Sequence, residues 1–182
     1  EMLELLALDL VEKRLVTDQI VLTIGYDIEN LTNPEIAKYY KGEIKTDHYG
    51  RKIPKHAHGT AHTSRQTSST KLIMDATLKL YDEIVDKKLL VRRVTIAACN
   101  LVPESSIENK QSYGQLDLFT DYDELMIKQE KIEKALQKER KIQEAMLDIK
   151  QRYGKNAILK GTNLQEGATT IERNESIGGH KA

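Results

Sequence analysis

The chain has 182 residues, with 28 basic and 28 acidic side chains and a formal net charge of zero, so overall charge favours no class of partner. No apolar run approaches the roughly 18 residues that a membrane span needs, and the single cysteine, Cys99, excludes an internal disulfide framework or a cysteine-built zinc site. We therefore expect a cytoplasmic protein without a membrane partner, built as one ordinary domain with appendages or as two small domains.

Residues 1–104 mix apolar runs and turn signals, as a packed α/β-type domain does. Apolar residues between positions 3 and 10 recur at helical spacing, which predicts a helix at the start of the chain. A strand is expected over about 19–27, with Ile20, Leu22, Ile24 and Tyr26 on one face. The following residues, 28–55, hold proline, glycine and asparagine breakpoints and read as a long loop.

The strongest charge asymmetry lies in residues 38–71, which contain eight Lys or Arg side chains and two carboxylates. Four of the five histidines fall in the same stretch. Strand alternation there would place one set of polar side chains on a single side: His56, His58, Thr60, His62, Ser64 and Gln66. Arg65 has the opposite parity unless a β-bulge intervenes.

Two further elements complete the expected domain. A helix over about 69–87 begins behind a cluster of Ser and Thr that can cap it. A strand within 89–102 alternates apolar residues with Arg93, Thr95 and Ala97. The order helix, strand, loop, strand, helix, strand predicts an α+β fold, in which an antiparallel sheet carries two helices on one face and leaves the other face free.

The free sheet face would carry cations, hydroxyl groups and imidazoles but few aromatic rings. Phosphates need cations and hydrogen-bond donors, whereas stacking of single strands needs exposed rings, so duplex DNA is the expected ligand. An ordinary solvated sheet face is the alternative and explains the pattern equally well. The candidate DNA contacts are Lys52, Lys55, His58, Thr60, His62, Ser64, Arg65, Arg93 and Thr95.

The three histidines His56, His58 and His62 suggest a second chemistry, because imidazoles on one strand face can hold zinc. No carboxylate or cysteine lies at a familiar spacing to supply a fourth ligand. A metal-dependent enzyme is therefore the lowest-ranked hypothesis. We expect no metal, no cofactor and no catalytic residue in this chain.

A long helix is expected over 121–153, with Thr120 as its N-cap and Gly154 as its stop. Its thin apolar stripe includes Ile132 and Ile142, which favours a coiled-coil or adaptor module as a second hypothesis, while interleaved charges favour a solvated helix. The polar tail, 154–182, is expected to be disordered, with a second partner site as the alternative.

The connector between domain and helix, 105–120, contains an apolar pentapeptide in a polar setting. Two leucines, a phenylalanine and a glutamine suit a linear recognition element, in which apolar anchors fill pockets on a partner and the amide sets orientation. A segment folded back on its own domain is the alternative. The five residues are Gln115, Leu116, Asp117, Leu118 and Phe119.

This pentapeptide resembles the bacterial sliding-clamp-binding motif at every specified position. Residues 60–104, "TAHTSRQTSSTKLIMDATLKLYDEIVDKKLLVRRVTIAACNLVPE", are similar to the end of the little-finger domain of Y-family, UmuC-like (ImpB/MucB/SamB-type) lesion-bypass DNA polymerases. The tail "NAILKGTNLQEGATTIERNESIGGHKA" resembles the ending of their Gram-positive members. The resemblance covers nearly the whole chain.

The resemblance implies a little finger of four strands and two helices that touches the phosphates of primer–template DNA during DNA repair. The family's first strand would precede residue 1, so the domain is expected to be partial, at 1–104. Nucleotidyl transfer would belong to palm carboxylates and Mg²⁺ of a longer parent polymerase, because no stretch of this chain matches them. Expected partners are duplex DNA and the sliding clamp; a recombinase filament and a second copy, paired through the open sheet edge, are further candidates.

Overall fold

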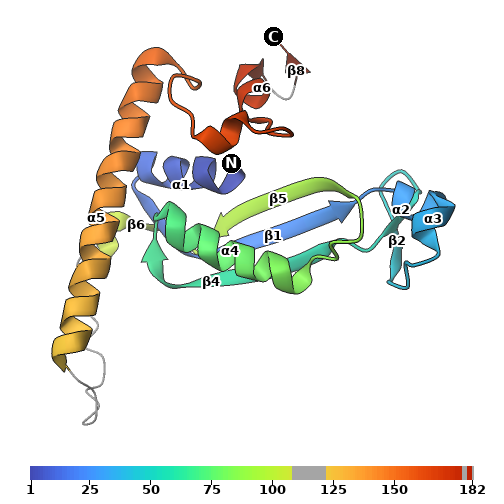
Figure 1. The fold of residues 1–182 in the computed structure, drawn as a ribbon, viewed down its shortest axis with the longest axis horizontal. Helices are drawn as coiled ribbons and strands as arrows, with labels where there is room; N and C mark the ends of the chain where they lie inside the picture. The colour runs from blue at the N-terminus through green and yellow to red at the C-terminus, as the bar shows by residue number, and fades with distance from the viewer. Residues whose placement is uncertain (108–121, 178–179, 182) are drawn as a thin grey trace. The chain divides into compact units, whose positions relative to one another are not determined.

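The computed structural model describes residues 1–107, 122–177 and 180–181. It confirms an α+β protein with an antiparallel sheet, several helices and a long helix near the C-terminus (Figure 1). The chain forms two compact units, one made of residues 1–15 and 103–182, the other of residues 16–102. The sequence-based boundary at residue 104 therefore runs close to one unit boundary, whereas the first helix groups with the C-terminal residues.

The unit of residues 16–102 is built on a sheet whose central strand is β1 (Leu15–Tyr26). Strands β4 (Ala57–Thr67) and β5 (Val91–Cys99) flank β1, both antiparallel to it, and the short β6 (Val102–Pro103) also pairs with β1. The four residues predicted to share one face are all buried, namely Ile20, Leu22, Ile24 and Tyr26. The predicted strand and its inward face are thus confirmed, although the strand begins at Leu15, earlier than the predicted start at residue 19.

Helix α4 (Thr70–Ile84) packs on β4, as Figure 1 shows. The helix starts where the sequence predicts, because the Ser69 side chain accepts a hydrogen bond from the backbone N–H of Leu72 at 3.2 Å. Ile73 is fully buried. A Cβ added at Gly59 of β4 would lie 2.9 Å from Leu80 Cδ1, so the absence of a side chain at Gly59 permits the close approach of α4.

The segment between β1 and β4, predicted as a loop, contains regular structure. It holds the short helices α2 (Glu29–Thr32) and α3 (Pro34–Ala37) and a hairpin of β2 (Ile44–Thr46) and β3 (Lys52–Pro54). Buried Asn30 anchors it: Nδ2 donates to the carbonyls of Asp27 and Leu90, and Oδ1 accepts from the Leu90 N–H, at 2.8–2.9 Å. The side chain of Asn30 thereby links the segment between β1 and β4 to Leu90, the residue that precedes β5.

The second unit combines α1 (Met2–Glu12) with α5 (Tyr122–Tyr153), which pack against each other. Helix α5 ends at Tyr153 as predicted, and Gly154 has the positive φ of +96° that favours glycine after a helix. Between the two helices in sequence lies a 3₁₀ turn, Glu104–Ser106. Arg140 of α5 is ion-paired to Glu104 of this turn, with NH2 and Oε2 2.8 Å apart.

The covered side of α5 differs in part from the apolar stripe that we predicted. Gln143 is buried, and Leu136, Leu147 and Lys150 are half-buried around it. The predicted stripe residues Ile132 and Ile142 are instead 45% and 52% exposed. The predicted stripe is therefore correct at Met146 and Ile149, which are half-buried, and wrong at Ile132 and Ile142. The covered face centres on a polar residue, which a search for apolar repeats passes over.

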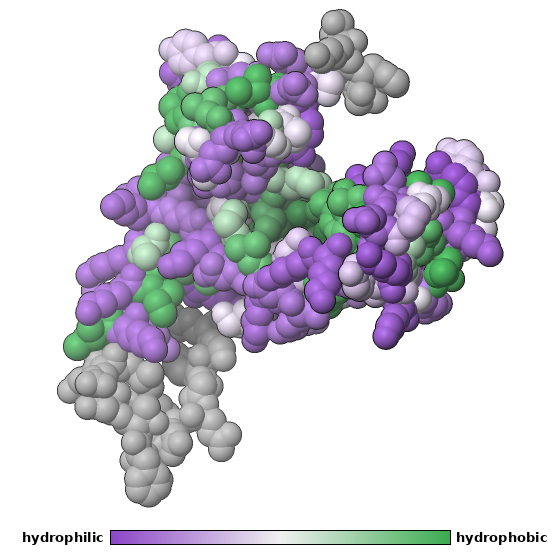
Figure 2. All heavy atoms as spheres, turned by 45° about the vertical axis from the view of Figure 1, so that its right-hand side comes forward, coloured by the Kyte–Doolittle hydropathy of each residue, from purple (hydrophilic) through white to green (hydrophobic). Residues whose placement is uncertain are grey.

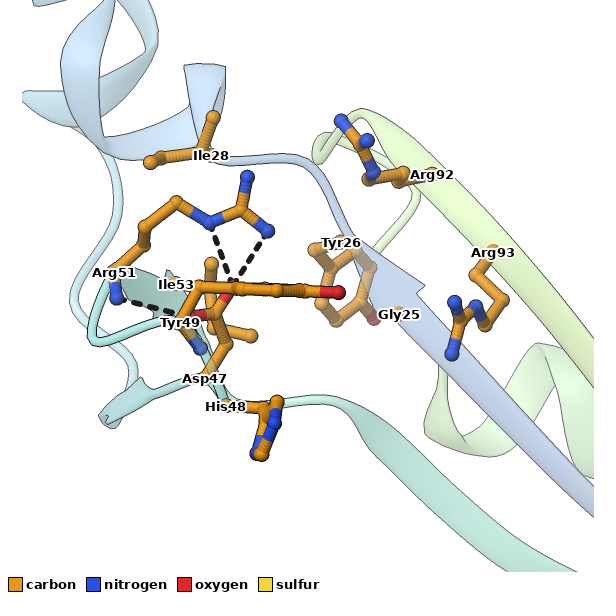
Figure 3. Close-up of a pocket in the computed structure, with 10 residues that line it drawn as sticks. All are labelled: Gly25, Tyr26, Ile28, Asp47, His48, Tyr49, Arg51, Ile53, Arg92 and Arg93. Carbon is orange, nitrogen blue, oxygen red and sulfur yellow. Dashed lines mark hydrogen bonds and ion pairs between the residues drawn. The ribbon is translucent and has the colours of Figure 1, made fainter.

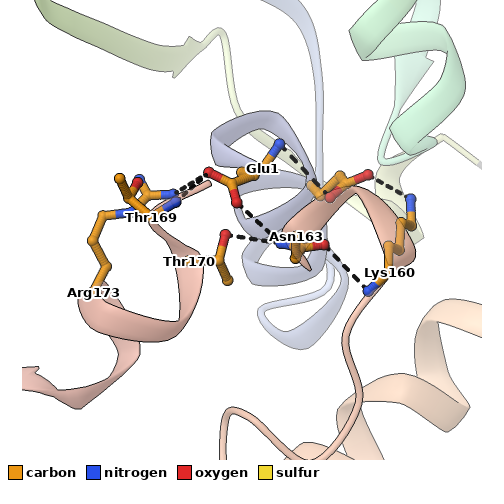
Figure 4. Close-up of polar contacts among 7 residues, drawn as sticks. Glu1, Lys160, Asn163, Thr169, Thr170 and Arg173 are labelled. Carbon is orange, nitrogen blue, oxygen red and sulfur yellow. Dashed lines mark hydrogen bonds and ion pairs between the residues drawn. The ribbon is translucent and has the colours of Figure 1, made fainter. Parts of the chain in front are cut away.

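The tail, predicted to be disordered, is folded over most of its length. It contains a 3₁₀ helix (Gly161–Leu164), α6 (Thr170–Glu175) and a minimal hairpin of β7 (Ser176–Ile177) and β8 (His180–Lys181). Asn163 Nδ2 donates to Thr170 Oγ1 at 2.8 Å, and both side chains are buried. Lys160 Nζ lies 2.6 Å from Glu4 Oε1 of α1. Figure 4 shows Lys160 next to Asn163, whose Oδ1 accepts a hydrogen bond from the Lys160 N–H. The polar composition of the tail predicted disorder. Composition alone does not show that the polar side chains of the tail form hydrogen bonds with buried groups and ion pairs with charged ones.

Candidate nucleic-acid interface

The candidate interface is the face of the sheet opposite the buried side of β1. On β1, Gln19, Val21 and Thr23 alternate with the buried residues and are half-buried. The antiparallel registers place residues of both neighbouring strands beside them. Three cross-strand rows result, His58–Thr23–Thr95, Thr60–Val21–Ala97 and His62–Gln19–Cys99.

Five of the nine predicted DNA contacts come together on this face. Four of them lie in the three rows, namely His58, Thr60, His62 and Thr95. The fifth, Arg93, pairs with Gly25 of β1, two positions beyond Thr23 along the strand. His58, His62, Arg93 and Thr95 are exposed, and Thr60 is half-buried. The face thus offers hydroxyl, imidazole and guanidinium groups in one plane, with no aromatic residue other than histidine in the three rows.

One side chain on the face is held in a fixed orientation. Thr23 Oγ1 lies 2.8 Å from His58 Nδ1, so this hydroxyl orients the imidazole ring. The rings of His56 and His58 meet edge to face, with centroids 6.3 Å apart. His58 Nε2 is the ring nitrogen left to meet a ligand, since it has no hydrogen bond within the described part of the chain.

Ser64 and Arg65 lie where the pairing of β4 becomes irregular. Thr17 pairs with Thr67 but Gln19 pairs with His62, so β4 contains additional residues between these two pairs. Ser64 and Arg65 are consecutive and both exposed, and Thr63 Oγ1 donates to the Arg65 carbonyl at 2.8 Å. The predicted alternation therefore holds only as far as His62. An irregularity in the pairing is therefore present at Arg65, the residue whose predicted orientation depended on one.

Lys52 and Lys55 do not join the sheet face. Lys52 belongs to β3, in the separate β2–β3 hairpin, and Lys55 follows the end of this strand. Lys55 Nζ lies 2.7 Å from Glu43 Oε2, and this hydrogen bond and charge raise the pKa of Lys55 and lower the pKa of Glu43. Both residues were predicted from their charge alone, and charge alone does not show that Glu43 neutralises Lys55.

A pocket of about 270 Å³ opens where β1 ends, β5 begins and the β2–β3 hairpin approaches them (Figure 3). Tyr49, Arg51, Arg92 and Arg93 contribute side chains to it. Tyr26 forms part of the wall, and burial raises the pKa of its phenol, which accepts a hydrogen bond from the Asp86 N–H at 3.0 Å.

This pocket was not predicted from the sequence. Arg51 entered only the count of basic residues, and neither Tyr49 nor Arg92 was singled out. A partial signal is the segment Asp47–Arg51, which reads as a turn around Gly50. In the structure the Asp47 carboxylate accepts from the N–H groups of Tyr49 and Arg51, both at 2.9 Å, and Gly50 has φ of +78°.

The predicted clamp-binding residues, Gln115, Leu116, Asp117, Leu118 and Phe119, lie outside the residues that the structure describes. The interpretation of this segment remains a sequence-based prediction.

Two further observations concern the described residues only. No three or more His, Cys, Asp or Glu side chains among them are grouped so that they could hold a metal ion. The described helices include none with the length and apolar character required to cross a membrane (Figure 2 shows mostly hydrophilic side chains on the face in view).

Comparison of the chain with protein-family models, with curated proteins and with solved structures found no match.

Proposed function

We propose that this chain is the DNA-binding and clamp-binding region of a Y-family lesion-bypass DNA polymerase, acting in the tolerance of DNA damage. The open sheet face of residues 16–102 binds the phosphates of duplex DNA, and residues 115–119 bind the bacterial sliding clamp. The observation that carries the DNA-binding part is the grouping of His58, Thr60, His62, Arg93 and Thr95 on one sheet face. The chain contributes binding, while nucleotidyl transfer belongs to palm residues that its sequence does not contain.

The chemistry of the face supports duplex rather than single-stranded DNA. Phosphate oxygens accept hydrogen bonds from hydroxyl, imidazole and guanidinium groups, and these contacts position a protein without reading sequence. Stacking of unpaired bases needs exposed aromatic rings, which the cross-strand rows lack. On the opposite side of the sheet, β1 directs Ile20, Leu22 and Ile24 into the core, so the sheet separates the interface from the core.

The order of elements supports assignment to the little-finger fold. Helix α1, strand β1, strand β4, helix α4 and strand β5 follow one another in the order expected for that fold without its first strand. The short elements between β1 and β4 form an insertion in this scheme. The same order leaves β4 and β5 at the two ends of the strand path β4–β1–β5.

The DNA-binding proposal is tested by fluorescence anisotropy with a labelled blunt duplex. We expect His58→Ala combined with His62→Ala to weaken binding, because both imidazoles lie on the face and are exposed. Lys79→Ala, an exposed cation on α4, is the control and should leave binding unchanged. Arg93→Ala should reduce the slope of log affinity against log salt by about 1, the effect of losing one phosphate contact. Equal affinities for the double variant and the unaltered chain would exclude the sheet face.

The clamp-binding proposal is tested by calorimetric titration of the chain into a purified bacterial sliding clamp. Micromolar affinity, about −8 kcal/mol, is expected. Leu118→Ala with Phe119→Ala should abolish it, because these residues are the proposed pocket anchors. Asp117→Ala is the control, since the motif leaves this position unspecified. Binding that survives the double substitution would contradict the proposal.

Exposed apolar residues on α5 favour a second candidate function, assembly through a helix. Met126, Ile127, Ile132 and Ile142 are between 45% and 66% exposed. Concentration-dependent association in sedimentation that is lost in Ile132→Asp with Ile142→Asp would support a coiled-coil module. A chain that stays monomeric at all concentrations would exclude it.

A further inference from the structure

The pocket at the end of the sheet offers two features that the open face lacks. It gathers three guanidinium groups, from Arg51, Arg92 and Arg93, and it has an exposed aromatic ring, Tyr49. Figure 3 shows Arg51 and Tyr49 on the hairpin side of the pocket and Arg93 on β5 across from them. A ligand in the pocket would therefore contact two separate elements of the same compact unit.

The charges in and beside the pocket leave one guanidinium uncompensated. Arg51 NH2 lies 2.7 Å from Asp47 Oδ2, and hydrogen bonds from Arg51 lower the pKa of this carboxyl, which keeps the pair ionised. Arg92 NH1 lies 3.3 Å from Asp27 Oδ2. Hydrogen bonds from the Glu29 N–H and from Arg92 lower the pKa of Asp27. Arg93 has no ion pair with any residue of the described chain, so the pocket presents about one net positive charge.

One net positive charge fits a phosphodiester better than a terminal phosphate. A phosphodiester carries a single negative charge, whereas a phosphate monoester carries about 1.5 to 2 negative charges at neutral pH. Arg93 is the group available to pair with it, and guanidinium groups bind phosphate oxygens through two parallel N–H donors. The electrostatics thus favour a nucleotide within a strand over a free nucleotide.

Tyr49 supplies a stacking surface. Its side chain is 79% exposed, and Arg51 Cζ lies 5.1 Å from the ring centroid, which holds the ring in place through a cation–π contact. Stacking of a base on an aromatic side chain is worth roughly 5- to 150-fold in affinity. The volume of about 270 Å³ is just below the range of roughly 300–1,000 Å³ typical of sites for drug-sized ligands, so it suits one base with its phosphate.

The position of Arg93 connects the pocket to the proposed DNA-binding face. Arg93 pairs with Gly25 in the sheet register, and both residues also line the pocket. A strand that follows the face therefore reaches the pocket at the end of β1.

We propose that this pocket binds one unpaired nucleotide of a DNA strand that continues beyond the duplex, with the base stacked on Tyr49 and a phosphodiester paired with Arg93. The inference rests on the proposed binding of duplex DNA by the open sheet face. A free nucleoside monophosphate is the other source of the same chemistry.

The test compares two labelled DNAs in anisotropy titrations of the full chain, a blunt duplex and the same duplex with a single-stranded overhang. We expect the overhang to raise affinity by roughly 5- to 150-fold. Tyr49→Ala should remove this gain and leave the affinity for blunt duplex unchanged, and Tyr49→Trp should retain the gain. Tyr39→Ala is the matched control, because Tyr39 is 72% exposed and has Lys38 Nζ 5.0 Å from its ring centroid.

The outcomes separate the two proposals. Equal affinity for both DNAs would overturn the pocket assignment while leaving duplex binding intact. Overhang binding that depends on Tyr49, without any blunt-duplex binding, would support the pocket and overturn the function proposed for the sheet face. Displacement of the overhang DNA by equimolar free deoxynucleoside monophosphate would overturn the assignment to a strand. An equal loss in Tyr39→Ala and Tyr49→Ala would also overturn it.

Discussion

The sheet core of residues 16–102 and the C-terminal tail are stabilised by different kinds of contact. In residues 16–102 the fully buried side chains are mainly aliphatic, with Ile20, Ile24 and Ile73 at 0% exposure. In the tail of the other unit the buried side chains are polar, Asn163 and Thr170, and they bond to each other. Aliphatic burial is non-directional and scales with area, whereas a buried polar pair requires both partners in place.

This difference explains why the fold of the sheet core could be predicted from the sequence and the fold of the tail could not. An apolar core produces periodic patterns along the chain, because each element must direct its apolar residues to one side. A polar contact between distant residues leaves no such pattern. The pair of Lys160 with Glu4 joins residues from opposite ends of the sequence.

The largest expected effect is in the aliphatic core of residues 16–102. Ile73→Ala should lower the free energy of unfolding of this unit by about 2–5 kcal/mol, since it removes buried methylenes and leaves a cavity. Hydrogen exchange followed by mass spectrometry, read on peptides within 16–102, measures the change. Leu78→Ala on the same helix is the control, because Leu78 is 51% exposed. A similar loss from both substitutions would show that burial by α4 does not determine stability here.

An intermediate effect is expected in the polar tail. Asn163→Ala should cost about 1–3 kcal/mol locally, because it leaves the buried Thr170 hydroxyl without its donor. Faster exchange should appear in peptides covering 160–176 and not in those covering 16–102. Exposed Gln165 provides the control substitution, Gln165→Ala. If both regions exchange faster together, the contrast between the sheet core and the tail fails.

The smallest effect is expected at the ion pair between the tail and α1. Lys160→Met should cost about 0.2–1 kcal/mol, because the Lys160 side chain is 49% exposed and water already solvates the charge. The cost should shrink further at high salt. Thermal unfolding at low and high ionic strength measures it, with exposed Lys155→Met as the control. A larger loss than that of Asn163→Ala would reverse the expected order.

Much of the candidate site could be predicted from strand alternation. The inward face of β1 and the outward positions of His58, Thr60, His62, Arg93 and Thr95 follow from a period of two once the strands are recognised. The alternation failed beyond His62 because additional residues of β4 enter the pairing there. Such an irregularity depends on how the two strands pair. The sequence of β4 alone therefore could not predict whether it is present.

The pocket could not be predicted in the same way. Tyr49 and Arg51 lie on a hairpin, and Arg92 and Arg93 follow about forty residues later in the sequence. Their proximity depends on contacts between the two segments, such as the hydrogen bonds of the Asn30 side chain with the backbone of Leu90, just before β5. Composition identified the basic stretch, but only the contacts showed that Asp47 and Asp27 compensate two of the three arginines.

The sequence by itself determined the class of the fold, the main sheet strands, the start of α4 and the C-terminal end of α5, because these depend on periodicity and on local caps. The tertiary structure alone decided which face of α5 is covered, that the tail folds, and which cations stay unpaired. Those features arise from contacts between residues far apart in the chain, whose free energies depend on distance and burial, and neither quantity is encoded in local pattern.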